Sequence, residues 1–153
     1  MRIVYTSGTY DMFHFGHLNV IKRSKALGDY LIVGVSTDEL VASYKRSPPI
    51  ISFDQRAEII RHLDFVDQVV TQTKLFDMDL MIQHGVNIMT IGSDWKDKYE
   101  EGLERVKGNS EIEIVFLPYT KSISTTEIKR AIVSGWQEDD EAFFRQADKA
   151  FKE

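Results

Sequence analysis

Two histidines separated by two residues stand near the amino terminus, His14 and His17, with Gly16 between them. They follow a short apolar run at residues 3–5 and precede an amphipathic segment at residues 18–27, so the pattern predicts a strand that leads into a helix. A helix N-terminus carries partial positive charge and unpartnered N–H groups, which suits an anion, and glycine lets a ligand approach the backbone. We therefore predict a phosphate site. The alternative, a metal pair, lacks an acidic residue at a matching offset.

Composition limits the classes of protein to which the chain can belong. Its 153 residues suit one domain, which we expect to span 1–153 with residues 134–153 as a C-terminal helical extension. A net charge of -5 argues against general nucleic-acid affinity, and the lack of cysteine excludes disulfides, thiolate metal sites and a thiol nucleophile. No apolar signal core is visible, and no apolar run approaches the length of a membrane span. We therefore expect a cytoplasmic protein with no membrane span.

Short apolar runs alternate with amphipathic segments along the chain. Because parallel strands need helical crossovers, this alternation predicts an α/β fold, a single-domain Rossmann-like open, mostly parallel five-stranded sheet with helices on both faces. The expected strands are residues 3–5, 30–35, 65–70, 87–91 and 111–117. The expected helices are residues 18–27, 36–42, 53–63, 75–84, 124–133 and 137–152, with partial helix at 96–108. Two of them begin with the S-x-x-E pattern of a capping box, at Ser36 and Ser124.

Three loops that leave strands are rich in polar residues, at 8–17, 92–98 and 119–126. In open parallel sheets, ligands collect beyond the carboxyl ends of the strands, near the point where the strand order reverses. We therefore expect these loops to converge on one ligand site.

The same loops carry a family resemblance. Residues 8–11, Gly-Thr-Tyr-Asp, and residues 14–17, His-Phe-Gly-His, resemble the G-T-F-D and H-x-G-H signature of the small cytidylyltransferase family, within the H-x-G-H nucleotidyltransferase superfamily. Residues 92–95, Gly-Ser-Asp-Trp, resemble its G-D-D-W segment, and residues 123–126, Ile-Ser-Thr-Thr, its I-S-T-T motif. The order and spacing match from about residue 2 to 133.

This resemblance implies an enzyme that transfers CMP from CTP to a small phosphorylated alcohol, with glycerol 3-phosphate as the first acceptor to consider. His14 and His17 would bind the triphosphate and stabilise charge at the α-phosphorus, with Lys45 or Arg46 reaching over the site. Mg²⁺ or another divalent cation would arrive with the nucleotide, without protein ligands. The implied nucleotide-binding residues are Gly8, Thr9, Asp11, Gly16, Asp94, Trp95, Thr120, Lys121, Ser124, Thr125 and Thr126, and the implied acceptor-binding residues are Asp38, Arg56, Asp64 and Tyr119.

Some of these assignments have alternatives. Asp11 could instead be an Asx-turn acceptor that stiffens its loop, and Lys45 and Arg46 could form a solvated basic turn. Tyr119 stands where the family has a phosphate-binding arginine, and Lys121 could restore that charge.

Asp64 also replaces a family arginine, and an acid beside the acceptor would favour an amino-bearing one such as ethanolamine phosphate, choline phosphate or a phosphonate. An adenylyltransferase and a nucleotide-binding module without turnover are further alternatives. The resemblance also implies a homodimer, with residues 61–67 as a plausible contact.

Overall fold

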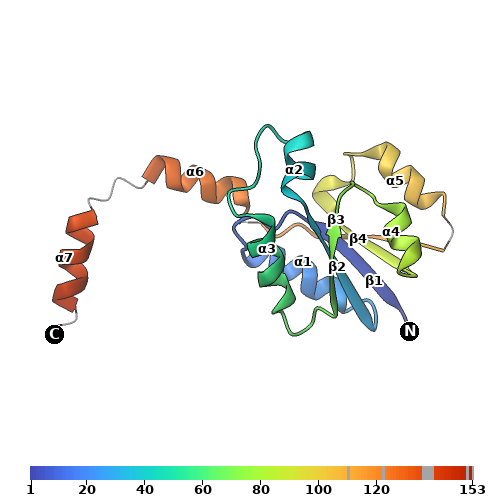
Figure 1. The fold of residues 1–153 in the computed structure, drawn as a ribbon, viewed down its shortest axis with the longest axis horizontal. Helices are drawn as coiled ribbons and strands as arrows, with labels where there is room; N and C mark the ends of the chain where they lie inside the picture. The colour runs from blue at the N-terminus through green and yellow to red at the C-terminus, as the bar shows by residue number, and fades with distance from the viewer. Residues whose placement is uncertain (110, 122, 136–139, 151, 153) are drawn as a thin grey trace. The chain divides into compact units, whose positions relative to one another are not determined.

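The structure is a computed structural model that describes residues 1–109, 111–121, 123–135, 140–150 and 152 (Figure 1). It consists of two compact units, Met1–Ile123 and Ser124–Glu153. The expectation of a single domain over 1–153 stays a prediction.

The first unit is built on five strands, which confirms the predicted sheet. They are β1 (Ile3–Gly8), β2 (Tyr30–Ser36), β3 (Gln68–Gln72), β4 (Ile88–Gly92) and β5 (Glu113–Leu117). Their order is β3-β2-β1-β4-β5 and every neighbouring pair is parallel. The chain builds outward from β1 to β3 and then returns to the other side of β1. The strand order therefore reverses between β1 and β4, where a ligand crevice is expected.

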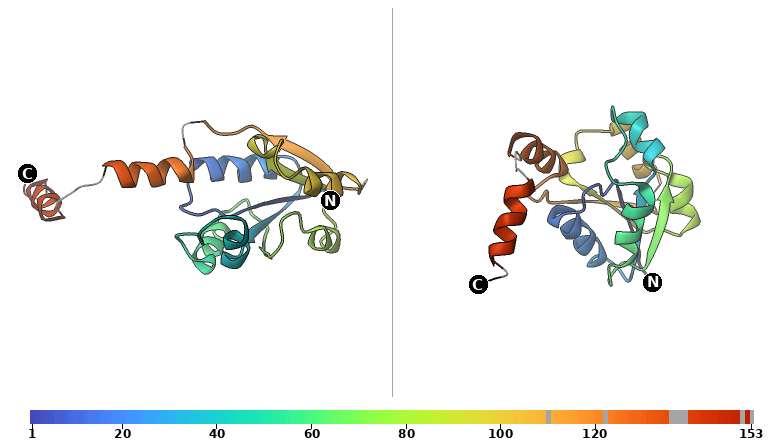
Figure 2. Two further views of the ribbon diagram at one scale, coloured as in Figure 1. Left: turned by 90° about the horizontal axis from the view of Figure 1, so that it is seen from above. Right: turned by 60° about the vertical axis from the view of Figure 1, so that its left-hand side comes forward.

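Helices cover both faces of the sheet, as Figures 1 and 2 show. On one face lie α1 (Phe15–Lys25) and α3 (Phe53–Arg61), and on the other lie α4 (Met78–Gln83) and α5 (Glu100–Lys107). Alternate strand residues feed the two cores because successive side chains point to opposite faces. The α1/α3 core includes Val4, Ile21, Leu31, Val33 and Ile60, and the α4/α5 core includes Tyr5, Ile32, Met81, Met89 and Leu103.

Two element boundaries differ from the sequence prediction because of distant partners. β3 begins at Gln68 rather than at residue 65, since the Asp67 carboxylate accepts from the Leu31 amide at 2.7 Å and from Lys25 Nζ at 2.6 Å. α2 (Asp38–Tyr44) is capped by Thr37, so the capping box predicted at Ser36 is wrong. Ser36 instead ends β2, and its hydroxyl donates to Gln72 Oε1.

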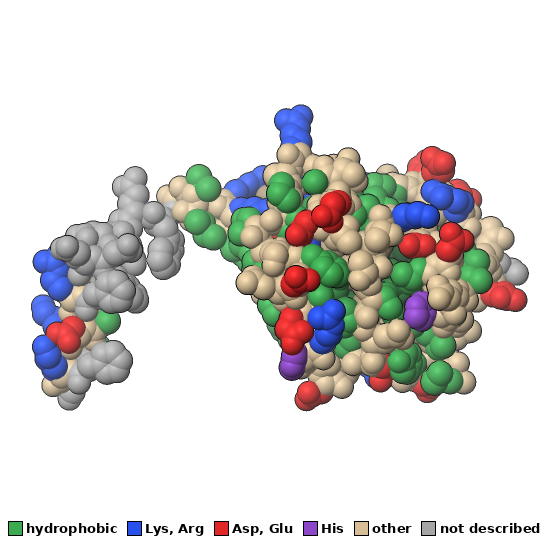
Figure 3. Space-filling view, in the orientation of Figure 1, with side chains coloured by type: hydrophobic (Ala, Val, Ile, Leu, Met, Phe, Trp, Pro, Cys, Tyr) green, Lys and Arg blue, Asp and Glu red, His purple; other side chains and the backbone are tan. Residues whose placement is uncertain are grey.

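The remaining elements follow the expected order, with shifted ends. α1 begins at Phe15 rather than at residue 18, because His14 serves as its cap. α4 begins at Met78 with Asp77 as its cap, and residues Ser93–Trp95 form a single 3₁₀ turn after β4. On the face seen in Figure 3, acidic and basic side chains of the first unit are interspersed rather than gathered by sign.

The second unit contains α6 (Thr125–Gly135) and α7 (Asp140–Ala150). The Glu127 amide donates to Ser124 Oγ at 3.1 Å, so Ser124 caps α6 as its motif predicts. The expected helix at 137–152 is found from residue 140 to 150, and residues 137–139, 151 and 153 lie outside the described residues. Among the helices that the structure describes, none is both long and apolar enough to cross a bilayer.

Candidate active site

The loop between β1 and α1 has an unusual backbone. Tyr10 and Met12 adopt φ angles of 57° and 48°, in the left-handed region that side-chain-bearing residues seldom occupy. The Tyr10 ring is buried and packs over Gly8, where a Cβ would lie 3.0 Å from Tyr10 Cζ. Packing therefore holds this loop in one conformation, as is common at ligand sites.

The two histidines form a stacked pair at the start of α1. Their ring centroids are 3.8 Å apart with an interplanar angle of 23°. The Gly16 amide donates to His14 Nδ1 at 3.0 Å, and the His14 amide donates to His17 Nδ1 at 3.2 Å. A Cβ at Gly16 would lie 2.8 Å from His14 Cε1, so glycine is needed for this close packing.

These hydrogen bonds fix which ring nitrogen carries the proton. A backbone N–H is always a donor, so Nδ1 of both rings must accept, and a neutral ring then carries its proton on Nε2. Each histidine thus offers one Nε2–H to a ligand.

Burial favours the neutral form of both rings. Burial lowers the pKa of His14. Burial also lowers the pKa of His17 to about 3, with further lowering by His14 and Lys45 that outweighs the opposing effect of Asp11. The site therefore presents two neutral N–H donors at a helix N-terminus, an arrangement that suits phosphate oxygens.

Asp11 is buried and faces the segment that follows α2. Its Oδ2 accepts from the Ile50 amide at 2.8 Å, and its Oδ1 accepts from the Ile51 amide at 2.9 Å. Asp11 therefore anchors the loop that carries Lys45 and Arg46. Its partners lie 39 and 40 residues away, so these contacts fix a distant loop and are not the Asx turn that the sequence left open for Asp11.

Arg56 and Asp38, predicted acceptor-binding residues, bind each other. The Arg56 side chain is 0% exposed, and its Nη2 lies 2.6 Å from Asp38 Oδ1. Its Nε donates to the Ile51 carbonyl at 2.9 Å and its Nη1 to the Thr9 carbonyl at 2.5 Å. Arg56 thus ties the β1 loop, α2 and the 46–52 loop together.

Lys45 and Arg46 are both exposed at the end of α2. The Lys45 amide caps the helix by donating to the Val41 carbonyl at 2.8 Å. The Lys45 charge lowers the pKa of His17. Next to it, the hydroxyls of Tyr44 and Thr9 are 3.4 Å apart, a contact that sequence reasoning missed.

The loop after β4 supplies aromatic surface beside the switch in strand order. The rings of Trp95 and Tyr99 stack with centroids 5.1 Å apart, and Lys98 Nζ lies 5.6 Å from the Trp95 centroid. A Cβ at Gly92 would lie 2.6 Å from Asp94 Oδ1, so glycine lets the Asp94 carboxylate sit against the end of β4. This pairing of a flat aromatic and a carboxylate is suited to a nucleoside.

The loop after β5 is joined to the loop after β4 and to α1. The Tyr119 amide donates to Ser93 Oγ at 3.2 Å, and Asn19 Nδ2 donates to Thr120 Oγ1 at 3.2 Å. Tyr119 and Lys121 are exposed. The polar loops 8–17, 92–98 and 119–121 therefore meet at the carboxyl edge of the sheet, as their composition predicts.

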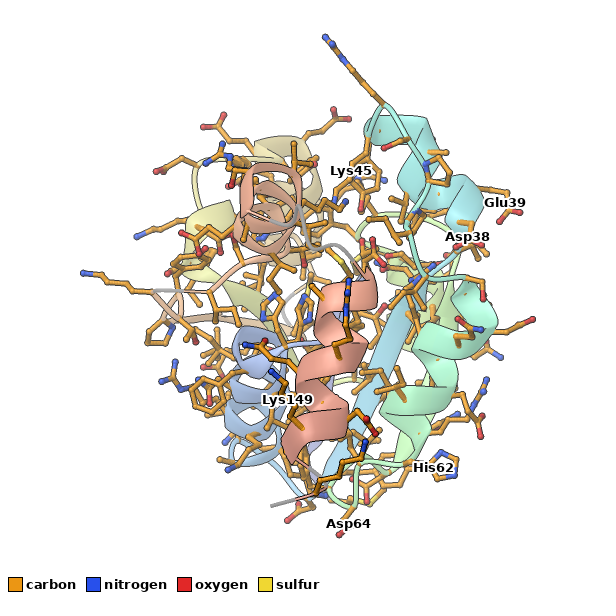
Figure 4. The ribbon with its side chains drawn as sticks, turned by 90° about the vertical axis from the view of Figure 1, so that its left-hand side faces the viewer. Asp38, Glu39, Lys45, His62, Asp64 and Lys149 are labelled. Carbon is orange, nitrogen blue, oxygen red and sulfur yellow. The ribbon has the colours of Figure 1, made fainter. Side chains whose placement is uncertain are left out.

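Two groups of predicted residues are not among those that the first unit gathers at this edge. Ser124, Thr125 and Thr126 belong to the second unit. Asp64 is exposed before β3, at the amino edge of the sheet, and Figure 4 shows it and His62 at the end of the first unit remote from Asp38 and Lys45. Within one chain, Asp64 is not brought to the other predicted acceptor residues.

Sequence reasoning also missed a hydrogen-bonded link that joins the ends of β1, β2 and β3. Gln72 Nε2 donates to Ser7 Oγ at 3.2 Å, and Ser36 Oγ donates to Gln72 Oε1 at 2.9 Å. The sequence signal for this link was a polar residue at or next to the last position of each of these strands. Among the described residues, no group of three or more His, Asp or Glu side chains is arranged to hold a metal ion.

The fold and the histidine pair define an α/β nucleotide-phosphate-binding protein. Residues 5–131 match the family described as cytidylyltransferase-like. The chain belongs to the cytidylyltransferase-like family, as its motifs predict.

Two relatives named glycerol-3-phosphate cytidylyltransferase align with this chain over nearly their whole length. It is 38% identical over 138 residues to glycerol-3-phosphate cytidylyltransferase from Bacillus spizizenii, covering 88% of this chain and 99% of that protein. It is 31% identical over 133 residues to the enzyme of the same name from Staphylococcus aureus, covering 86% and 96%. Ethanolamine-phosphate cytidylyltransferase from Mus musculus is 40% identical over 106 residues, which cover 64% of this chain and 26% of that protein.

A solved structure supports the same fold. The crystal structure of the lipopolysaccharide core biosynthesis protein from Thermoplasma volcanium superposes with a TM-score of 0.64 and 28% identity, covering 80% of this chain and 99% of that chain.

Proposed function

We propose that this protein transfers a cytidylyl group from CTP to the phosphate of a small phosphorylated alcohol, with glycerol 3-phosphate as the first choice, and releases pyrophosphate. The observation that carries this proposal is the His14–His17 pair, which offers two neutral Nε2–H donors at the start of α1. Relatives named glycerol-3-phosphate cytidylyltransferase, matched over 96–99% of their length, support the choice of nucleotide and acceptor.

The reaction makes limited demands on the protein. A phosphate oxygen of the acceptor, already anionic near neutral pH, attacks the α-phosphorus of CTP as the bond from that phosphorus to the α,β-bridging oxygen breaks. The electron pair leaves with pyrophosphate, so no general base and no covalent enzyme intermediate is required. Repulsion between two polyanions must be reduced and the reacting oxygens aligned in line.

In this proposal each group has a defined task. The Nε2–H groups of His14 and His17 donate to the α- and β-phosphate oxygens, where charge increases in the transition state. Lys45 offsets acceptor and nucleotide charge, Trp95 and Asp94 hold the base and ribose, and the α6 start contributes hydroxyls from Ser124 to Thr126. CTP enters as its magnesium complex, and the cation neutralises phosphate charge.

A panel assay tests this function directly. Pyrophosphate release is measured with CTP or ATP and Mg²⁺ against glycerol 3-phosphate, ethanolamine phosphate, choline phosphate and 2-aminoethylphosphonate. We expect turnover with CTP and glycerol 3-phosphate. Preference for ATP would overturn the nucleotide assignment, and CTP binding without turnover on any acceptor would indicate a nucleotide-binding module.

An amino-bearing acceptor is the second candidate. It is supported by the 40% identity to ethanolamine-phosphate cytidylyltransferase over 106 residues. A higher kcat/KM for ethanolamine phosphate than for glycerol 3-phosphate would establish it.

We also propose a homodimer that uses the exposed region of residues 61–67, which lies away from the loops at the carboxyl edge. Light scattering after gel filtration gives the mass, and a monomer at assay concentration would exclude this arrangement. The cytoplasm is the proposed compartment, since both substrates are polyanions that bilayers exclude.

A further inference from the structure

We infer that Gln72 is a positioning residue for the phosphate site, a role that rests on the proposed function. Gln72 is the last residue of β3 and is 2% exposed. Its side-chain amide joins Ser7 at the end of β1 to Ser36 at the end of β2.

This link crosses a whole strand. β2 lies between β1 and β3, with Ser36 paired to Gln72 and Gly34 paired to Ser7. The Gln72 side chain therefore spans β2 to reach Ser7. Gly34 leaves the neighbouring space to the Tyr5 hydroxyl, with which a Cβ at that position would collide. The Gln72 carbonyl also accepts from the Thr37 amide at 3.1 Å, so its main chain holds the residue that caps α2.

Ser7 and Ser36 are each followed by residues that belong to the proposed site or support it. Ser7 directly precedes the 8–17 loop, and Ser36 directly precedes Thr37 and Asp38. Arg56 joins the same two segments a second time, through the Thr9 carbonyl and Asp38, and it comes from α3 on the opposite face of the sheet. The β1 loop and the start of α2 are therefore cross-linked twice, by a buried cation on one face and a neutral amide on the other.

The loss of one link should displace the loop without unfolding the sheet. A misplacement near 1 Å of catalytic groups can cost a large factor in rate, whereas KM depends less on it. The amide must both accept and donate, so an apolar side chain of similar length removes both hydrogen bonds and leaves the buried Ser36 hydroxyl and the half-buried Ser7 hydroxyl without this partner.

The experiment compares Gln72→Met with Gln68→Met, a matched change at the amino end of the same strand. We expect Gln72→Met to lower kcat by roughly 10-fold to 100-fold with less than about threefold change in KM for CTP. We expect Gln68→Met to retain kcat. Ser7→Ala and Ser36→Ala should each lower kcat less, and adding either to Gln72→Met should cost nothing more, because the three act as one network.

Hydrogen exchange gives a readout that does not need turnover. We expect faster exchange in Gln72→Met over residues 8–14 and 37–44, with exchange over residues 88–92 unchanged. If wild-type protein shows no transfer to any acceptor, the proposed function fails while this readout still tests Gln72. Unchanged exchange in those segments, or wild-type kcat in folded Gln72→Met, would overturn the inference. Should Gln72→Met not fold, Ser7→Ala and Ser36→Ala decide it by the same measurements.

Discussion

Asp11 and Arg56 hold opposite sides of one peptide segment. Asp11 accepts from the Ile51 amide at 2.9 Å, and Arg56 donates to the Ile51 carbonyl, also at 2.9 Å. The two side chains come from the β1 loop and from α3, so the segment between α2 and α3 is fixed by both of its neighbours. A loop that carries the basic residues Lys45 and Arg46 is thereby given a fixed end.

Arg56→Met should be strongly destabilising. It removes three hydrogen bonds and leaves Asp38 and the Thr9 and Ile51 carbonyls without their partner, and loss of one member of a buried pair costs about 3–5 kcal/mol. Asp38 is 37% exposed, so we expect the lower end of that range. Urea unfolding of wild type and Arg56→Met measures this loss in the free energy of unfolding. Arg61→Met in the same helix, where the exposed Glu58 pair is lost, should cost less than about 1 kcal/mol, and equal costs would refute the buried role.

His14→Ala and His17→Ala should each lower turnover by roughly 10² to 10³-fold, because each removes one preorganised N–H donor. Pyrophosphate release at saturating CTP is the measurement. His62→Ala is the control, since the His62 side chain is 75% exposed and lies away from the site. A folded His17→Ala protein with near-normal turnover would remove the pair from the mechanism.

Acid should destabilise the protein in part through His17. Its pKa is about 3 in the folded chain, whereas an unfolded histidine titrates near 6.5. As the pH falls below the unfolded value, the unfolded state takes up a proton that the folded state excludes, so the free energy of unfolding decreases from about pH 6.5 toward the folded pKa. Between pH 7 and 5 we expect wild type to lose about 1–2 kcal/mol more than His17→Asn. Equal losses would show that His17 titrates normally.

Substitution should distinguish the two basic residues after α2. The Lys45 charge reaches His17, so Lys45→Met should raise the pKa of His17 and lower kcat/KM by roughly 100-fold. Arg46→Met is the matched change one residue further on, and it should change kcat/KM by less than about 10-fold. NMR titration of the His17 ring and steady-state kinetics together test this, and a larger effect of Arg46→Met would reverse the assignment.

The sheet and the place of the site could be predicted because their signals are local. Apolar runs alternating with amphipathic segments define the strands, and the polar loops that leave them mark the carboxyl edge.

What could not be predicted depends on partners far along the chain. Asp11 binds amides 39 and 40 residues away, and Arg56 binds a carbonyl 47 residues away. Asp67 delays the start of β3 for the same reason, since its partners lie 36 and 42 residues earlier. A residue type alone does not reveal whether such a group faces substrate or another loop.

The segment of residues 46–49 is held at both ends, by the Lys45 amide on α2 and by Asp11 on Ile50. Its own side chains are largely exposed. Changes of sequence in this short bridge therefore leave the histidine pair and its supports in place. This bridge is therefore the part of the proposed site that can be altered at least cost to the fold, which makes it the natural target for redirecting the proposed transfer to a new phosphate ester.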